Sequence, residues 1–307
     1  MQKLLAAEHG GLNDSYAETY ALTGNPRWLR LAERIRHRAV LDPLTEQRDI
    51  LPGLHANTQI PKLIGLARLH ELTGDPGHGE AAHFFHQTVA QHHSYVIGGN
   101  SEREAFGPPD TISTRITDRT CESCNSYNML KLTRHLWSWR PDGSLFDFYE
   151  RVQLNHILAH QNPATGMFAY FMPLSSGSRR TWSTLEDSFW CCVGSGMESH
   201  AKHGDSIWWE DGGTLFVNLF IPSTAHWREQ GFEAAIESEY PFADRVALRI
   251  DAAPRRPLTL ALRLPGWCDA PTLRLNGREI EFERRDGYAR IARTWMDGDR
   301  LELALPM

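Results

Sequence analysis

Two hydrophobic patterns divide the chain. In the first, apolar residues recur every three or four positions, as at Leu63, Leu66 and Leu69, which predicts amphipathic helices. In the second, apolar and polar residues alternate in short segments bounded by Gly, Pro or Asn-Gly, which predicts strands. The patterns change near Asp211-Gly-Gly213, so the sequence predicts a helical domain over residues 1–212 and an antiparallel β-sandwich over 213–307.

Two turns in the helical part share one order of residues. Tyr20–Pro26 and Leu72–Pro76 each join an apolar helix end to glycine, then Asn or Asp, then proline. Glycine favours a helix C-cap, Asn or Asp an N-cap, and proline the first position of the next helix. The Thr-Gly steps begin at Thr23 and Thr73, 50 residues apart. A helical hairpin that recurs at such a period predicts an α/α toroid or solenoid.

The remaining elements follow from the same patterns. A third helix pair is predicted after the stretch at 121–124, and its second helix covers 145–158. Long loops are predicted at about 40–58 and 96–121, and long irregular segments in compact domains are usually functional. Strands are predicted at about 167–172, 178–184, 214–220, 246–250, 258–264, 273–275 and 301–305.

Composition argues against two classes of partner. With 41% hydrophobic residues, 23% charged residues and a net charge of -6, the chain has no basic field of the kind that nucleic-acid binding shows. No apolar run approaches the roughly 20 residues needed to cross a bilayer. Ten tryptophans and fifteen histidines would suit a sugar-binding cleft, although tryptophan is also ordinary core material. Neither nucleic acid nor a membrane is expected as a partner, and a homo-oligomer stays open.

Four residues with metal-binding side chains are predicted to form a zinc-ligand set. Five cysteines in 307 residues are too few for a disulfide framework, and adjacent cysteines rarely pair with each other. Structural zinc sites are four-coordinate and rich in thiolate. The alternative is a group of buried, inert thiols. The predicted ligands are Glu122, Cys124, Cys191 and Cys192.

The spacing of these residues predicts local geometry. Glu122 and Cys124 are two positions apart, so they are expected in an extended entry to a helix that begins near Asn125. Neighbours on a strand point to opposite faces, so the adjacent cysteines need a tight turn. Gly194 and Gly196 would permit that turn.

A glycine-opened loop, Gly98–Phe106, presents two carboxylates, Glu102 and Glu104, before an apolar flank. A carboxyl group against apolar side chains has a raised pKa, which suits a general acid. The alternative is a solvated loop that carries ordinary charges.

A polar cluster at Leu54–Pro61 opens a helix and contains His55. The histidine is a candidate binding residue. In the alternative hypothesis Asn57 or Thr58 caps the helix and the histidine is incidental.

Four segments carry a family resemblance: Leu54–Pro61, Gly98–Glu104, Glu122–Thr133 and Phe189–Glu198. They resemble the glycoside hydrolase family 127 and 146 group of β-L-arabinofuranosidases, and the resemblance runs through nearly the whole chain. It implies a partial (α/α)6-barrel catalytic domain followed by a β-sandwich. Because members of that group are longer at the N-terminus, the chain is expected to be truncated there.

The resemblance implies roles for individual residues. Zn²⁺ would be held by the four predicted ligands, with Cys191 as the nucleophile and Glu104 as the acid/base. Cys121 and Cys268 match no ligand of the family and are expected to be structural. The implied sugar-contacting residues are His55, Glu150 and Tyr170.

The implied reaction is retaining hydrolysis of terminal β-L-arabinofuranosides in plant-type glycans. A first alternative is a non-catalytic carbohydrate-binding or structural zinc module. A second keeps hydrolysis but assigns it to a carboxylate pair, Glu104 and Glu122. Thiolate sites survive best in reducing surroundings, which favours the cytoplasm, although a signal peptide upstream would make the protein periplasmic or secreted.

Overall fold

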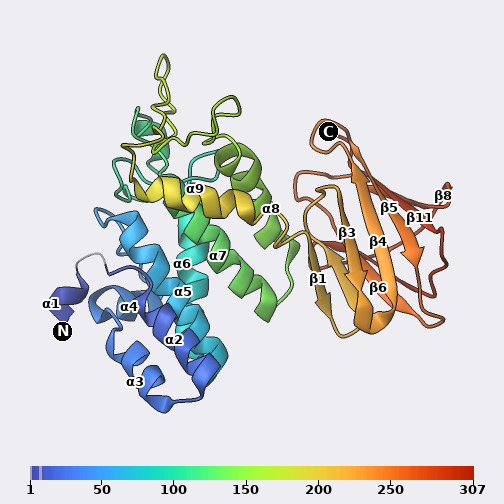
Figure 1. The fold of residues 1–307 in the computed structure, drawn as a ribbon, viewed down its shortest axis with the longest axis horizontal. Helices are drawn as coiled ribbons and strands as arrows, with labels where there is room; N and C mark the ends of the chain where they lie inside the picture. Colours follow the sequence, from blue (N-terminus) through green and yellow to red (C-terminus); the bar gives the residue numbers. More distant parts are fainter. Residues whose placement is uncertain (1, 7–8) are drawn as a thin grey trace. The chain divides into compact units, whose positions relative to one another are not determined.

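The computed structural model describes residues 2–6 and 9–307, which form two compact units. The first unit holds the chain up to Arg140 together with Phe148–His200. The second holds Pro141–Asp147 and Ala201–Met307. The first unit is mainly helical, and the second is built from strands (Figure 1). The predicted fold class, a helical region followed by a β-sandwich, is therefore confirmed, whereas the exact boundary near residue 212 stays a prediction.

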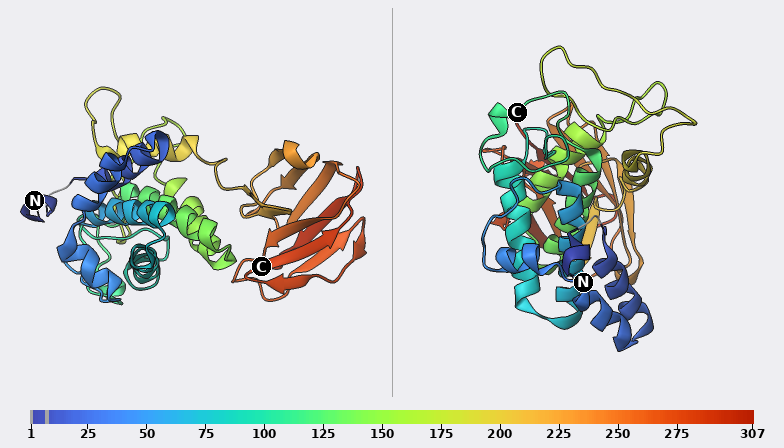
Figure 2. Two further views of the ribbon diagram at one scale, coloured as in Figure 1. Left: turned by 90° about the horizontal axis from the view of Figure 1, so that it is seen from below. Right: turned by 90° about the vertical axis from the view of Figure 1, so that its left-hand side faces the viewer.

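The first unit is a set of packed helices (Figures 1 and 2). The central helix α5 contacts α2, α6 and α7, and most of its residues are buried. None of the helices in the described residues combines the length and the apolarity needed to cross a membrane. The helices are α1 (Gln2–Leu5), α2 (Leu12–Thr23), α3 (Pro26–Arg34), α4 (Arg38–Thr45), α5 (Ala56–Thr73), α6 (Pro76–Thr88), α7 (Ser123–Trp139), α8 (Gly143–Val152) and α9 (Cys191–Ala201), with π-helical turns η1 (Val89–His93) and η3 (Gln153–Ile157).

The two predicted hairpin turns are confirmed in detail. Gly24 ends α2 with φ 65°, and the Asn25 side chain accepts the Arg27 N–H at 3.0 Å at the start of α3. The second turn repeats this arrangement: Gly74 has φ 73°, and Asp75 caps α6. In each turn, neighbouring residues supply the hydrogen-bond partners for the backbone groups at the helix ends. The local sequence was therefore sufficient to predict the turn.

Two predictions about irregular segments are wrong. The predicted loop at 40–58 contains the end of α4, because Val40, Leu41 and Leu44 lie at helical spacing and are all buried. The strands predicted at 167–172 and 178–184 are isolated bridges, such as Ala169 with Trp182, because the segment pairs one residue at a time and forms no ladder. The segment at 96–121 is irregular apart from the short helix η2 (Ile112–Thr114).

The second unit is a sandwich of two sheets, of five and six strands. Strands occur at all five positions predicted beyond residue 212. One pair departs from the antiparallel expectation, because β2 and β6 run parallel. The strand order is β1-β2-β6-β10-β9 in one sheet and β3-β4-β5-β11-β7-β8 in the other. The strands are β1 (Trp208–Asp211), β2 (Thr214–Val217), β3 (Ser223–Trp227), β4 (Phe232–Ser238), β5 (Arg245–Ala252), β6 (Leu258–Arg263), β7 (Thr272–Leu275), β8 (Arg278–Glu279), β9 (Glu283–Arg285), β10 (Tyr288–Arg293) and β11 (Arg300–Ala304).

Candidate metal and active site

Two helix starts carry the predicted metal ligands. Glu122 is the extended residue before α7, with φ -71° and ψ 130°, and Cys124 lies in the first turn of that helix. Cys191 and Cys192 open α9. The helix therefore begins before Asn125, and the cysteine pair lies in a helical turn and not in the tight turn expected from the glycines. The first turn of a helix has free N–H groups and a positive dipole end, so it favours thiolates and carboxylates.

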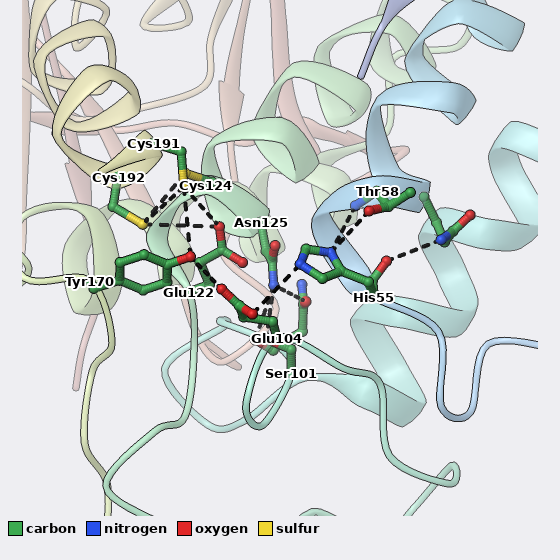
Figure 3. A network of polar contacts seen from close by, with 12 residues as sticks. His55, Thr58, Ser101, Glu104, Glu122, Cys124, Asn125, Tyr170, Cys191 and Cys192 are labelled. Atoms are coloured by element: carbon green, nitrogen blue, oxygen red, sulfur yellow. Dashed lines mark hydrogen bonds and ion pairs between the residues drawn. The ribbon is translucent and has the colours of Figure 1, made fainter. Parts of the chain in front are cut away.

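The four predicted ligands come together in the first unit (Figure 3). Their ligand atoms all lie within 4.8 Å of one another. Cys191 Sγ is 3.5 Å from Glu122 Oε1, and Cys124 Sγ is 3.5 Å from Cys192 Sγ. Three of the four residues are buried, whereas Cys191 is exposed. Two stretches of chain about 70 positions apart thus build one cluster with one accessible sulfur.

The pKa values of the four ligand groups depend on one another because the groups lie so close together. Burial, together with the nearby Cys191 thiolate, raises the pKa of Glu122 to about 9. Hydrogen bonds to its two neighbouring thiols raise the pKa of Cys124, while hydrogen bonds from Cys124 and Cys192 lower that of Cys191. Within the described residues, Glu122 Oε2 is buried without a hydrogen-bond partner. Four acidic groups this close ionise together only around a cation, and one carboxylate with three thiolates fits a thiophilic divalent metal.

A loop with unusual backbone geometry holds Glu104 beside the cluster. Ser101, Arg103 and Glu104 have φ values of 74°, 50° and 67°, a region that non-glycine residues rarely adopt. The Glu104 carbonyl accepts the Ala56 N–H at 2.7 Å, which anchors the loop to the start of α5. Backbone strain of this kind concentrates at functional sites, where the surrounding structure maintains it.

Tyr170 connects the two predicted catalytic residues. Its hydroxyl donates a short hydrogen bond to Glu104 Oε1 and lies 3.8 Å from Cys191 Sγ (Figure 3). The structure therefore places an exposed thiol and a half-exposed carboxyl group on either side of one phenol. This is the arrangement that a nucleophile and an acid/base would need.

Glu102, the other carboxylate of the loop, has a different environment. It lies 3.2 Å from Arg103 Nε and 3.5 Å from Arg115 Nη1. Its side chain is 15% exposed, against 37% for Glu104. Glu102 is thus an ion-paired residue of the loop, and Glu104 alone of the pair faces the cluster.

His55 both caps α5 and approaches Glu104. Its Nδ1 accepts the Thr58 N–H at 3.2 Å, so a neutral ring carries its proton on Nε2, which lies 3.8 Å from Glu104 Oε2. The alternative hypothesis assigned the cap to Asn57 or Thr58, and this is wrong because the histidine itself is the cap. His55 can therefore cap α5 through Nδ1 and still face Glu104 through Nε2.

Three further residues singled out by the sequence are buried. Glu150 lies in α8 and is 7% exposed, and its contact with the sugar stays a prediction. Cys121 is fully buried against Tyr95 and Met172, and Cys268 is 5% exposed in the second unit, as expected for structural thiols.

Asn125 is a residue of the site that sequence analysis did not identify. Its side-chain amide donates to Asn100 Oδ1 at 3.0 Å and to Ser101 Oγ at 2.9 Å. These bonds tie the start of α7, which carries two ligands, to the loop that carries Glu104. The available signal was its position directly after Cys124, in a segment already singled out.

Comparisons with known proteins agree with this arrangement. The family profile of the β-L-arabinofuranosidase GH127 catalytic domain matches residues 1–205, and that of the GH127 middle domain matches residues 214–307. The fold is similar to a GH127 beta-arabinofuranosidase (TM-score 0.83, 21% identity, 96% of this chain and 51% of that chain). It is also similar to the GH127 beta-L-arabinofuranosidase of Geobacillus stearothermophilus T6 (TM-score 0.78, 22% identity, 97% and 54%). No curated protein matches the chain. The chain spans about half the length of these solved structures.

Proposed function

Because the chain belongs to the GH127 β-L-arabinofuranosidase family, we propose that it is a retaining glycoside hydrolase that releases terminal β-L-arabinofuranose from plant-type glycans. One observation carries the proposal: the single exposed thiol of the ligand cluster shares the Tyr170 hydroxyl with the Glu104 carboxyl group. A retaining mechanism requires such a nucleophile and acid/base pair close together. The presence of thiolates favours a reducing compartment such as the cytoplasm.

The proposed metal is Zn²⁺, held by Glu122, Cys124, Cys191 and Cys192. Bound zinc would keep the cysteine sulfurs deprotonated at neutral pH. The four ligands then have different roles. Three ligands are buried and hold the site together, while the exposed one can reach a substrate.

In the first proposed step, the Glu104 carboxyl group protonates the departing glycosidic oxygen while Cys191 Sγ attacks the anomeric carbon. The carbon–oxygen bond breaks and a thioglycosyl intermediate forms. In the second step, the Glu104 carboxylate removes a proton from water, and the water oxygen displaces the sulfur. The Tyr170 hydroxyl, which contacts both groups, would orient the carboxyl group between the two steps.

A mechanism based on the carboxylate pair Glu104 and Glu122 has less support. Glu122 is 1% exposed, so substrate has little access to its carboxyl group. The same residue lies within contact distance of two sulfurs, which suits a ligand.

The test compares Cys191→Ser with Cys268→Ser in the same chain, using an aryl β-L-arabinofuranoside. With zinc supplied in excess so that the site stays loaded, loss of the nucleophile should lower kcat/KM by at least about 10³-fold, whereas the control cysteine lies outside the cluster and should leave turnover unchanged. An electrophilic furanoside analogue should label Cys191, as read by peptide mass spectrometry. Full activity of Cys191→Ser would contradict the proposal. If the native chain shows no turnover but binds metal and sugar, it is instead a carbohydrate-binding module.

A further inference from the structure

The open edge of the sandwich unit contains a cavity rich in tryptophan. Strands β1 and β3 are the edge strands of the two sheets, and a cavity of about 260 Å³ lies against both. Three of the ten tryptophans of the chain line it. No residue of this cavity belongs to the proposed catalytic machinery. The lining residues are Trp208, Trp209, Glu210, Leu215, Ala225, His226 and Trp227.

Strand alternation explains how the walls of this cavity form. In the β1–β2 ladder Trp208 pairs with Val217 and Glu210 with Leu215, so these side chains share one face of the five-stranded sheet. On β3, Ser223, Ala225 and Trp227 share a face by the same rule. The Trp208 Nε1–H group donates to Ser223 Oγ at 2.9 Å, which shows that the two faces meet. Trp208 and Trp227 therefore lie on the facing sides of the two sheets, and the cavity, which Trp209 and His226 also line, lies at the edge where β1 and β3 meet.

The polar groups of the cavity include a donor without an acceptor. Trp227 is only 8% exposed, and within the described residues its Nε1–H group is buried without a hydrogen-bond partner. Nearly all buried N–H groups in proteins have an acceptor. Trp227 lines the cavity, but its Nε1 atom is itself inaccessible, so the ring must turn before a ligand in the cavity can accept a hydrogen bond from it.

The chemistry of the lining selects the class of ligand. Indole faces bind the apolar face of a sugar ring, and hydroxyl groups are acceptors for an indole N–H. Glu210 is an exposed acceptor at the same cavity, and His226 is held by Glu233 at 3.2 Å. None of the lining residues is Lys or Arg, so an anionic ligand such as a phosphate or a nucleic acid has no counter-charge here.

We propose that this tryptophan cavity is an accessory binding site for a neutral saccharide, separate from the catalytic cluster. Its role would be to retain a glycan chain on the protein while the first unit acts on the ends of that chain. The existence of the site stands on its own geometry. The choice of an arabinose-containing glycan as its ligand rests on the proposed function.

The experiment measures binding of soluble plant arabinogalactan to the full chain by affinity electrophoresis and calorimetry. A Cys191→Ser background prevents consumption of the glycan. Trp208→Ala removes one aromatic wall and should weaken binding about tenfold, whereas Trp227→Phe keeps a ring, removes only the N–H group and should weaken binding about fivefold. Trp267→Ala is the matched control, because Trp267 is 46% exposed in the same unit and does not line the cavity.

The outcomes separate the two proposals. Two results together support the site. Binding is weakened in both cavity variants and unchanged in Trp267→Ala. Turnover of a small aryl furanoside is also unchanged when the two cavity substitutions are made in the native chain. Absence of binding by the parent chain, equal binding by all variants, or an equal loss in the control overturns it. If Trp208→Ala melts at a lower temperature than the parent, Trp227→Phe decides. If the native chain has no hydrolytic activity but its binding depends on the cavity, the proposed function fails and the site stands.

Discussion

Two carboxylates in the helical unit, the partly exposed Glu71 and the buried Glu122, have opposite environments. Glu71, near the end of α5, accepts hydrogen bonds from His135 Nδ1 at 2.7 Å, Trp139 Nε1 at 2.9 Å and Arg68 Nη1 at 2.9 Å. Burial alone would raise its pKa, but these donors outweigh burial and lower the pKa to about 2. Glu122 has thiols for neighbours, and its pKa rises to about 9. The first carboxylate has charged and polar donors from its own chain, whereas the second has only thiols beside Oε1 and, within the described residues, no partner at Oε2, so it could hold a cation.

The strongest test of this difference is Glu122→Gln. The substitution removes an anionic ligand, and even residues that only support a ligand change metal affinity by about 10 to 100-fold. Zinc affinity should therefore fall by at least about 100-fold, as measured by competition with a chromophoric chelator. The rise of the melting temperature on adding zinc should also disappear. Glu71→Gln is the matched control, and equal zinc affinity in the two variants would show that Glu122 is no ligand.

The second test is the stability of Glu71→Gln across pH. The pKa of Glu71 is lowered from 4.5 to about 2, and because solvent screens this partly exposed group, the ion pairs contribute about 1–2 kcal/mol of stability at pH 7. Because the folded-state pKa is the lower one, this contribution is complete above about pH 4.5 and is lost as the pH falls towards 2. Urea unfolding should give a gap of about 1–2 kcal/mol between parent and variant at pH 7, and the gap should narrow below pH 4.5. A gap that does not change with pH would mean that Glu71 acts through packing alone.

A third test uses two glycines of α9, the helix that carries the cysteine pair. A Cβ at Gly196 would lie 2.7 Å from Phe168 Cδ1 and 2.9 Å from His160 Nε2, whereas a Cβ at Gly194 meets nothing within 4 Å. Gly196→Ala should destabilise the unit by about 1–3 kcal/mol through overpacking and should weaken metal binding by displacing α9. Gly194→Ala should instead stabilise it by about 0.5–1 kcal/mol, because alanine suits a helix interior. Thermal unfolding measures both, and equal effects would contradict the packing argument.

The difference between local and distant partners also explains how much of the structure the sequence could predict. The hairpin turns at Gly24 and Gly74 were predicted because their caps lie within three residues. The ligand set was predicted from residue type, spacing and resemblance. The helix starts at Ser123 and Cys191 were not predicted, because cysteine has no strong local preference and each helix is held by distant parts of the unit.

The Glu71 cluster gave no sequence signal, since its donors His135 and Trp139 lie 64 and 68 positions away. The only sequence signal for the tryptophan cavity was the high number of tryptophans in the chain. Its residues come together because edge strands of two different sheets meet, and the alternation within one strand does not predict which strand it meets.

The smallest expected effects come from the two hairpin turns, where Asn25→Ala and Asp75→Ala each remove one N-cap. The Asn25 side chain accepts the Arg27 N–H at 3.0 Å, and that of Asp75 accepts the Gly77 N–H at 2.9 Å, both at exposed positions. Each variant should lose about 1 kcal/mol of stability, because alanine leaves one amide of the first helical turn without its acceptor. The turns are 50 residues apart and share no partner, so the double variant should lose the sum to within about 0.5 kcal/mol in urea unfolding. Neither change should alter zinc affinity. A cap variant that weakened metal binding would show that the turns and the cluster are coupled, and that local and tertiary contributions in this unit are not separable.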